Sequence, residues 1–312
     1  MTLRSAGAGG AVWCALAAVF FSGRGQLGPI DLMFLLAPLV VVPLGLGLLS
    51  SGVPPGFPAS LLRIASWMQP VGALLLVFSF QNGPGARAVL WAACWFVVGA
   101  LVGLSGLLGL RESSKPPLET FCSVVAQLHL FIGVAWLAAS RWGSTPMGFA
   151  EPIVLLTAVH FHFAGFATSL VTGATLASIR KAGRRFSGLI SAAAIGVLVG
   201  PTLVALGFVI SLRLKIFAIA LFSISLMVVT LHGLPTLHHV RSLLARVLIG
   251  ISTTAVLAGM TLAVLWALGE WTGRIWIDLD HMARIHGALN GVGFSSCGLL
   301  GWLLAKQGEA RT

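Results

Sequence analysis

Residues 186–211, FSGLISAAAIGVLVGPTLVALGFVIS, form a run of 26 residues without a charged side chain. A helix rises ~1.5 Å per residue, so about 20 apolar residues cross the ~30 Å hydrocarbon core of a bilayer. The run is continuous rather than alternating, and an open sheet cannot satisfy its backbone in lipid, so strands are excluded. Residues 186–211 therefore predict a transmembrane helix.

Runs of the same kind fill most of the chain. We expect about ten spans, or nine if the short first run does not cross: 7–22, 30–50, 60–80, 86–110, 117–140, 150–178, 186–211, 214–236, 242–270 and 281–305. The first run mimics a signal peptide, but no small-x-small cleavage site follows it, which favours an uncleaved helix. The predicted fold class is an all-α, polytopic transmembrane helical bundle. We expect residues 1–312 to form a single integral membrane domain.

Composition supports a lipid environment. The chain is 57% hydrophobic and only 9% charged, and its mean hydropathy is +0.99. Soluble domains carry about 25% charged residues because their surface faces water. A chain so poor in charge cannot cover a water-facing surface, so the bilayer is its expected partner.

The net charge of +11 raises the question of nucleic acid. The 19 basic residues are scattered over short loops, with no continuous stripe and no nucleic-acid motif, so we expect no nucleic-acid partner. If the N-terminus is cytoplasmic, twelve Lys and Arg residues fall inside and seven outside. Because cytoplasmic loops carry the excess of positive charge, both termini are predicted to be cytoplasmic.

Prolines interrupt three of the expected spans, at Pro38 and Pro43, at Pro70 and at Pro201. Proline removes a backbone donor, so in a membrane the freed carbonyl must find a new partner. Broken helices are common in transporters. Small residues at four-residue spacing mark where helices touch.

Polar residues inside the spans are the candidate site. Four histidines lie away from the expected helix ends, and intramembrane ionisable residues are functional candidates by default. Glu151 and Asp280, near helix ends, are expected to lead protons or cations toward them. The candidate binding residues are His129, Thr157, His160, His162, His286, Asn290 and Glu151.

Helical spacing separates the two neighbouring histidines of the sixth span. His162 shares a face with Gly165, Ser169 and Gly173, so it should point into a tight helix contact. His160 lies roughly 200° round the same helix. We therefore expect each to meet a different neighbour rather than to chelate one ion together.

A structural role competes with each functional one. A buried imidazole is commonly just hydrogen-bonded, and Glu151 beside Pro152 suits a helix start, where acids complement the dipole. His238 and His239 lack acidic neighbours, and we expect no metal site. Haem between two axial histidines fits geometrically, for example His129 with His160 or His286, but no spacing requires it and the cofactor stays unknown.

Two segments carry a family resemblance: HFHFAGF at 160–166, and HGALNGVGF at 286–294, which GLLGW follows at 298–302. Together they resemble the YndJ-like family of bacterial membrane proteins. The resemblance implies a bacterial inner-membrane protein whose marked residues are the same histidines and asparagine. It implies no defined biochemical activity, although members are sometimes labelled transporters.

Three functions stay open on the sequence. The first is binding or transport of a small solute or proton, since histidine exchanges protons near neutral pH. The second is a membrane-embedded enzyme that acts on a lipid-soluble substrate through histidine acid–base chemistry or a His-bound haem or metal. The third is a structural or assembly subunit. No HExxH, Walker A, GxSxG or paired DDxxD motif is present to decide between them.

Overall fold

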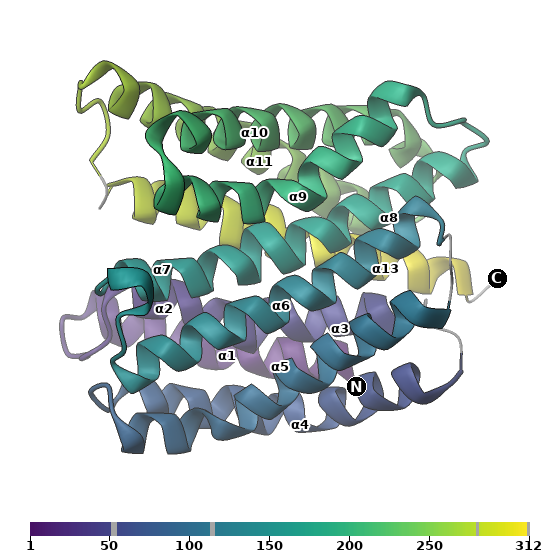
Figure 1. Cartoon of the computed structure of the whole chain (residues 1–312). Coiled ribbons are helices and arrows are strands. Elements are labelled where there is room, and N and C mark those ends of the chain that lie inside the picture. The colour runs from purple at the N-terminus through teal and green to yellow at the C-terminus, as the bar shows by residue number, and fades with distance from the viewer. Residues whose placement is uncertain (51–54, 113–115, 279–280, 311–312) are drawn as a thin grey trace. The chain divides into compact units, whose positions relative to one another are not determined.

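A computed structural model describes residues 1–50, 55–112, 116–278 and 281–310 (Figure 1). The described part is built of helices and contains no strand. Ten helical segments are long and apolar enough to cross a membrane: Thr2–Phe21, Pro29–Ser50, Phe57–Phe80, Ala86–Arg111, Leu118–Trp142, Ile153–Lys181, Gly188–Ile210, Leu212–His239, Leu243–Thr272 and Met282–Gly308. These segments confirm the predicted fold class and include the short first run.

The helices divide into two compact units. Unit 1 comprises Met1–Lys115 and Val124–Ala167, and unit 2 comprises Pro116–Ser123 and Thr168–Thr312. The sixth apolar segment, Ile153–Lys181, therefore contributes its first half to unit 1 and its second half to unit 2.

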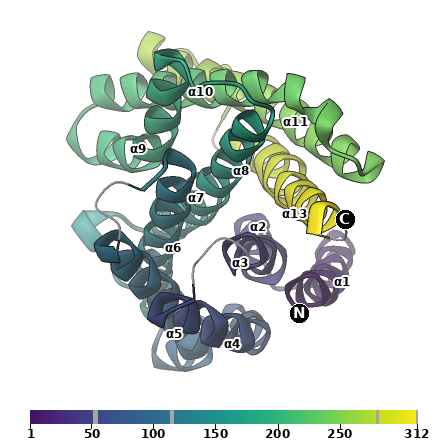
Figure 2. The same ribbon diagram turned by 90° about the vertical axis from the view of Figure 1, so that its right-hand side faces the viewer.

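Unit 1 contains a helix hairpin and two interrupted spans. In the hairpin the Ser79 hydroxyl donates to the Ala88 carbonyl at 2.7 Å and the Ser105 hydroxyl to the Pro58 carbonyl at 3.0 Å. The two hairpin helices, α4 and α5, run side by side in Figures 1 and 2. The elements of unit 1 are α1 (Thr2–Phe21), α2 (Pro29–Leu36), η1 (Ala37–Val41), α3 (Val42–Ser50), α4 (Phe57–Phe80), α5 (Ala86–Glu112), most of α6 (Leu118–Trp142), η2 (Pro146–Gly148), α7 (Ile153–His160) and η3 (Phe161–Ala167).

Unit 2 is formed by helices whose starts are capped by serines. The hydroxyl oxygens of three serines accept hydrogen bonds from backbone N–H groups in the first turns of α9, α10 and α11. These bonds satisfy donors that the start of a helix leaves without a partner, and the serines are Ser187, Ser211 and Ser242. Arg180 pairs with Glu119 at 2.7 Å. The elements are the first turn of α6, α8 (Thr168–Lys181), α9 (Gly188–Ile210), α10 (Leu212–Gly233), η4 (Leu234–His239), α11 (Leu243–Thr272), η5 (Met282–His286), η6 (Leu289–Ser296) and α13 (Cys297–Ala310).

The second span shows how a proline interruption is accommodated. Its middle, η1, is a π-helical turn, in which the Val42 N–H donates to the Ala37 carbonyl five residues back. The Pro38 carbonyl thereby loses its regular donor, and the Gln69 side-chain amide supplies one at 2.7 Å. The Ser5 hydroxyl in turn donates to the Gln69 side-chain oxygen at 2.6 Å. A carbonyl exposed by the interruption has found a side-chain partner on a neighbouring helix, as the sequence predicts.

Candidate functional site

The two sequence segments that carry the family resemblance are both π-helical. Residues Phe161–Ala167 form η3 in unit 1, and Met282–His286 and Leu289–Ser296 form η5 and η6 in unit 2. A π-helical turn shifts the backbone hydrogen bonds and so leaves carbonyls for other donors, and such turns are frequent at functional sites. The Nδ1 atoms of His162 and His286, one in each segment, both lie against carbonyl oxygens, of Ala158 in α7 and of Gly259 in α11.

His162 is the most enclosed of these histidines. Its side chain has no solvent exposure, and its Nδ1 lies 2.8 Å from the Ala158 carbonyl oxygen. A carbonyl only accepts, so Nδ1 carries the proton and Nε2 of the neutral ring carries a lone pair. Among the residues that the structure describes, Nε2 has no hydrogen-bond partner. An acceptor is therefore left open inside unit 1.

Aromatic rings surround that acceptor. The Trp95 indole stacks on the His162 ring at 6.3 Å between centroids and 20° between planes, and Phe34 meets the same ring edge-on at 5.0 Å. Trp95 is fully buried, and its Nε1–H likewise has no acceptor within the described ranges. An unpartnered donor and an unpartnered acceptor thus lie on neighbouring rings.

Glycines allow this close approach. A Cβ added at Gly133 of α6 would lie 2.6 Å from His162 Nδ1, and a Cβ added at Gly165 of η3 would lie 2.6 Å from the Cβ of His129. His129 is 4% exposed, contacts the Phe161 ring at 5.7 Å and interacts electrostatically with His160. The structure therefore brings the three histidines predicted in this half of the chain to one helix crossing. It also confirms that His162 points into a tight contact.

The two other candidates in unit 1 support the start of α7. The Thr157 hydroxyl donates to the Ile153 carbonyl at 2.8 Å, one turn back. A carboxylate oxygen of Glu151 accepts the Leu155 N–H at 3.1 Å. This contact matches the helix-start role that the sequence offered as the alternative for Glu151.

In unit 2, His286 and Asn290 bind the facing helix and their own backbone. His286 Nδ1 donates to the Gly259 carbonyl of α11 at 2.9 Å, and the Asn290 amide donates to the His286 carbonyl at 2.9 Å. A Cβ added at Gly259 would lie 2.7 Å from the Asn290 amide nitrogen. The remaining acid of the sequence analysis, Asp280, lies outside the described residues.

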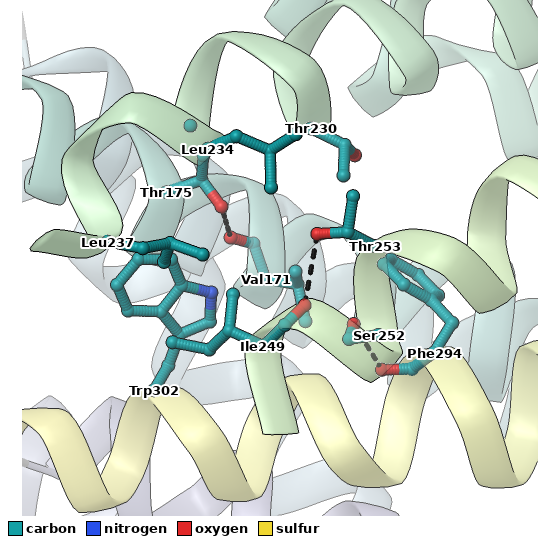
Figure 3. A pocket seen from close by; sticks show the side chains of 11 residues that line it. Val171, Thr175, Thr230, Leu234, Leu237, Ile249, Ser252, Thr253, Phe294 and Trp302 are labelled. Atoms are coloured by element: carbon teal, nitrogen blue, oxygen red, sulfur yellow. Dashed lines mark hydrogen bonds between the residues drawn. The ribbon is translucent and has the colours of Figure 1, made fainter. Parts of the chain in front are cut away.

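A small pocket in unit 2 lies between α8, α10, α11 and the last span (Figure 3). Its hydroxyls already have acceptors: Thr175 donates to the Val171 carbonyl at 2.9 Å, Thr253 to the Ile249 carbonyl at 3.0 Å and Ser252 to the Phe294 carbonyl at 2.8 Å. The space holds no more than about one water molecule. It is too small for a solute larger than water or ammonia.

Two residues of unit 1 escaped the sequence analysis. Nothing marks Trp95 among ten tryptophans. Arg141 directly follows an apolar run and so resembles a loop cation, yet it lies in the last turn of α6 and is 7% exposed. Within the described part of the chain, no three His, Cys, Asp or Glu side chains cluster closely enough to hold a metal ion.

Ten apolar helices, several of them interrupted, define a polytopic integral membrane protein. The family model described as YndJ-like protein matches residues 32–294, and the chain belongs to this family. It is 27% identical over 254 residues to the uncharacterized membrane protein YndJ of Bacillus subtilis (strain 168). The matched region covers 79% of this chain and 44% of that protein, so the chain spans less than half the length of this curated relative. No solved structure matches.

Proposed function

We propose that the protein binds a small polar solute or a proton at the His162 imidazole of unit 1 and carries it across the membrane. The observation that carries this proposal is the pair of fully buried groups, His162 Nε2 and Trp95 Nε1–H, that have no hydrogen-bond partner among the residues the structure describes. Leaving a buried polar group unpartnered costs about 1–3 kcal/mol. A bound molecule that pairs with both groups would remove this cost.

The chemistry of the two groups defines what that molecule is. It accepts a hydrogen bond from the indole N–H of Trp95 and donates one to Nε2 of His162. Water, ammonia, alcohols and amides do both. His129 and His160, which interact electrostatically, are the proposed proton-exchanging partners at the same crossing. Thr157 and Glu151 hold the start of the α7 helix that leads into η3.

The remaining candidates, His286 and Asn290, lie in unit 2, where we propose a supporting role: His286 ties the last span to α11, and Asn290 holds the His286 carbonyl. The proposed location is a bacterial inner membrane with both ends of this segment cytoplasmic. The excess of Lys and Arg in the loops of that side supports this orientation.

The test compares proteoliposomes that contain the wild-type chain or His162→Leu. Leucine fills a similar volume and removes both ring nitrogens. We expect the wild type to conduct protons, reported by an enclosed pH dye under an imposed potential, or to take up ammonia, urea or short alcohols, reported by light scattering. His162→Leu should lose at least tenfold of that flux, and Trp95→Phe should weaken it.

His232→Leu is the matched control. His232 Nδ1 makes the same contact with a carbonyl four residues back, at 2.9 Å from Val228, but the side chain is only half-buried. Its loss should leave the flux unchanged. Wild-type flux in folded His162→Leu, or no flux of any probe above empty liposomes, would refute the proposal.

A further inference from the structure

A second site in unit 1 centres on Arg141, at the end of α6. The side chain is 7% exposed, and its guanidinium carbon lies 4.5 Å above the centre of the Phe80 ring. Its backbone carbonyl accepts the Gly85 N–H at 2.8 Å, which fixes the end of α6 against the turn between α4 and α5. The Phe80 ring and the end of α6 therefore fix the place of the guanidinium, with Nε enclosed.

The guanidinium lacks the partners that a buried cation usually has. Its Nε is buried without an acceptor, and neither of its terminal nitrogens makes a hydrogen bond or ion pair with any residue in the described ranges. Contact with an aromatic face offsets only part of the lost hydration. A planar fork of N–H donors fits the two oxygens of a carboxylate or phosphate.

Two carboxylates lie close by without pairing directly with Arg141. Asp31 and Glu151 interact electrostatically with Arg141, and with one another, but neither comes within the 4.0 Å of an ion pair. One oxygen of Asp31 accepts the Gly28 N–H at 2.8 Å at the start of α2. Glu151 caps α7 in the same way. Each carboxylate thus keeps a second oxygen that makes no hydrogen bond within the described chain.

The charges of this cluster, Arg141 with Asp31 and Glu151, decide which ligand fits. One guanidinium interacts electrostatically with two carboxylates, and the starts of α2 and α7 each add about half a positive charge. The cluster is therefore close to neutral. A bound anion or cation would leave it unbalanced, whereas a zwitterion would not.

We propose that this cluster binds a zwitterion that carries an oxyanion and an ammonium group. The Arg141 guanidinium takes the oxyanion, and the free oxygens of Asp31 and Glu151 take the ammonium. Two sources supply this chemistry, a free amino acid and the headgroup of an ethanolamine phospholipid. The site stands apart from His162, because the rings of Phe80 and Phe34 lie between them, and it does not rest on the transport proposal.

The experiment measures thermal stabilisation of the whole chain in nanodiscs of phosphatidylglycerol, which lacks an ammonium group. Glycine and glycerophosphoethanolamine are the two zwitterionic probes. Acetate and ethylammonium each carry one half of the chemistry. We expect at least one zwitterion to bind at least tenfold more tightly than either half. The zwitterion that binds better identifies the source as a free amino acid or a lipid headgroup.

Variants locate the binding. Arg141→Gln should weaken binding of the zwitterion at least tenfold. Arg141→Lys, which keeps the charge but not the planar fork of donors, should bind the zwitterion with an affinity between those of the wild type and of Arg141→Gln. Arg87→Gln is the matched control, an exposed arginine at the first turn of α5. If Arg141→Gln does not fold, Asp31→Asn keeps a helix-capping oxygen and should weaken the zwitterion but not acetate.

Three results would overturn the proposal. They are equal binding of the zwitterions and of their halves, no binding of any probe, and unchanged binding in Arg141→Gln. Arg141 would then serve only to hold the helix ends of unit 1 together.

Discussion

The π-helical segments of the two units each carry a histidine whose Nδ1 lies against a carbonyl oxygen, but the two histidines differ in their hydrogen-bond partners. In unit 2 the carbonyls around η5 and η6 receive side-chain donors: Asn290 serves the His286 carbonyl, and Ser252 of α11 serves the Phe294 carbonyl at 2.8 Å. His286 itself donates to the facing helix at Gly259. In unit 1, by contrast, His162 of η3 donates to its own helix and leaves Nε2 open.

This difference distinguishes a histidine that holds two helices together, His286, from one that has an acceptor left for a ligand, His162. Both histidines use their Nδ1–H donor, but the bond from His286 joins two helices and so fixes how they pack. A hydrogen bond within one helix fixes the ring without joining two helices, and in His162 the second nitrogen has no partner among the described residues. The Trp95 indole, whose N–H also lacks an acceptor there, stacks on the same ring. The same residue type in the same kind of turn therefore holds helices in unit 2 and presents an acceptor in unit 1.

The largest effect on the free energy of unfolding should come from replacing, with alanine, the glycines that contact these π-helical segments. A Cβ at Gly133 meets the fully buried His162 ring, which Phe34 and Trp95 prevent from moving, so Gly133→Ala should lower the free energy of unfolding by about 1–3 kcal/mol. Gly259→Ala meets only the flexible end of Asn290 and should cost less than about 1 kcal/mol. Unfolding by SDS in mixed micelles measures both.

Gly250→Ala on α11 supplies the reference, since a Cβ there meets no other atom within 4 Å. It should be neutral or slightly stabilising, because alanine favours helix by up to about 1 kcal/mol over glycine. An equal loss of stability in the Gly133 and Gly259 variants would show that the two crossings are packed alike.

The fold was predictable because its signal is repeated in every span. Apolar runs such as 188–210 need no partner to be recognised, and lipid admits few alternatives to a helix. The face that carries His162, Gly165 and Ser169 was also predictable from the spacing of these residues, and all three are buried.

The details of the site were not predictable for a physical reason. A π-helical turn arises from contacts with neighbouring helices, so η3 follows from packing rather than from local sequence. The Trp95 donor meets His162 only because α5 and η3 meet in three dimensions. Arg141 looks like a loop cation until Phe80 and the helix ends enclose it.

A smaller effect should follow from removing the side-chain donors in unit 2. Ser252→Ala leaves the Phe294 carbonyl without its partner from α11, and Asn290→Ala does the same to the His286 carbonyl. Hydrogen bonds between membrane residues contribute about 0.6 kcal/mol on average and up to about 1.7 kcal/mol, and we expect losses in this range. Thr261→Ala, which removes an exposed hydroxyl bound to its own helix, should change little. Losses no greater than that of Thr261→Ala would mean that unit 2 does not depend on these contacts.

The smallest expected effect is a change in the free energy of unfolding whose sign differs between the two histidine variants. His286→Leu removes the bond to the Gly259 carbonyl and should lower the free energy of unfolding by about 0.6–1.7 kcal/mol. His162→Leu also removes one bond, but it removes the unpartnered Nε2 as well, whose burial costs about 1–3 kcal/mol. We therefore expect His162→Leu to be as stable as the wild type or more stable, in the same SDS titration. If it unfolds as readily as His286→Leu, Nε2 already has a partner in the resting protein. The two π-helical segments would then differ in which partner their histidine has, and not in whether a ring nitrogen is left open.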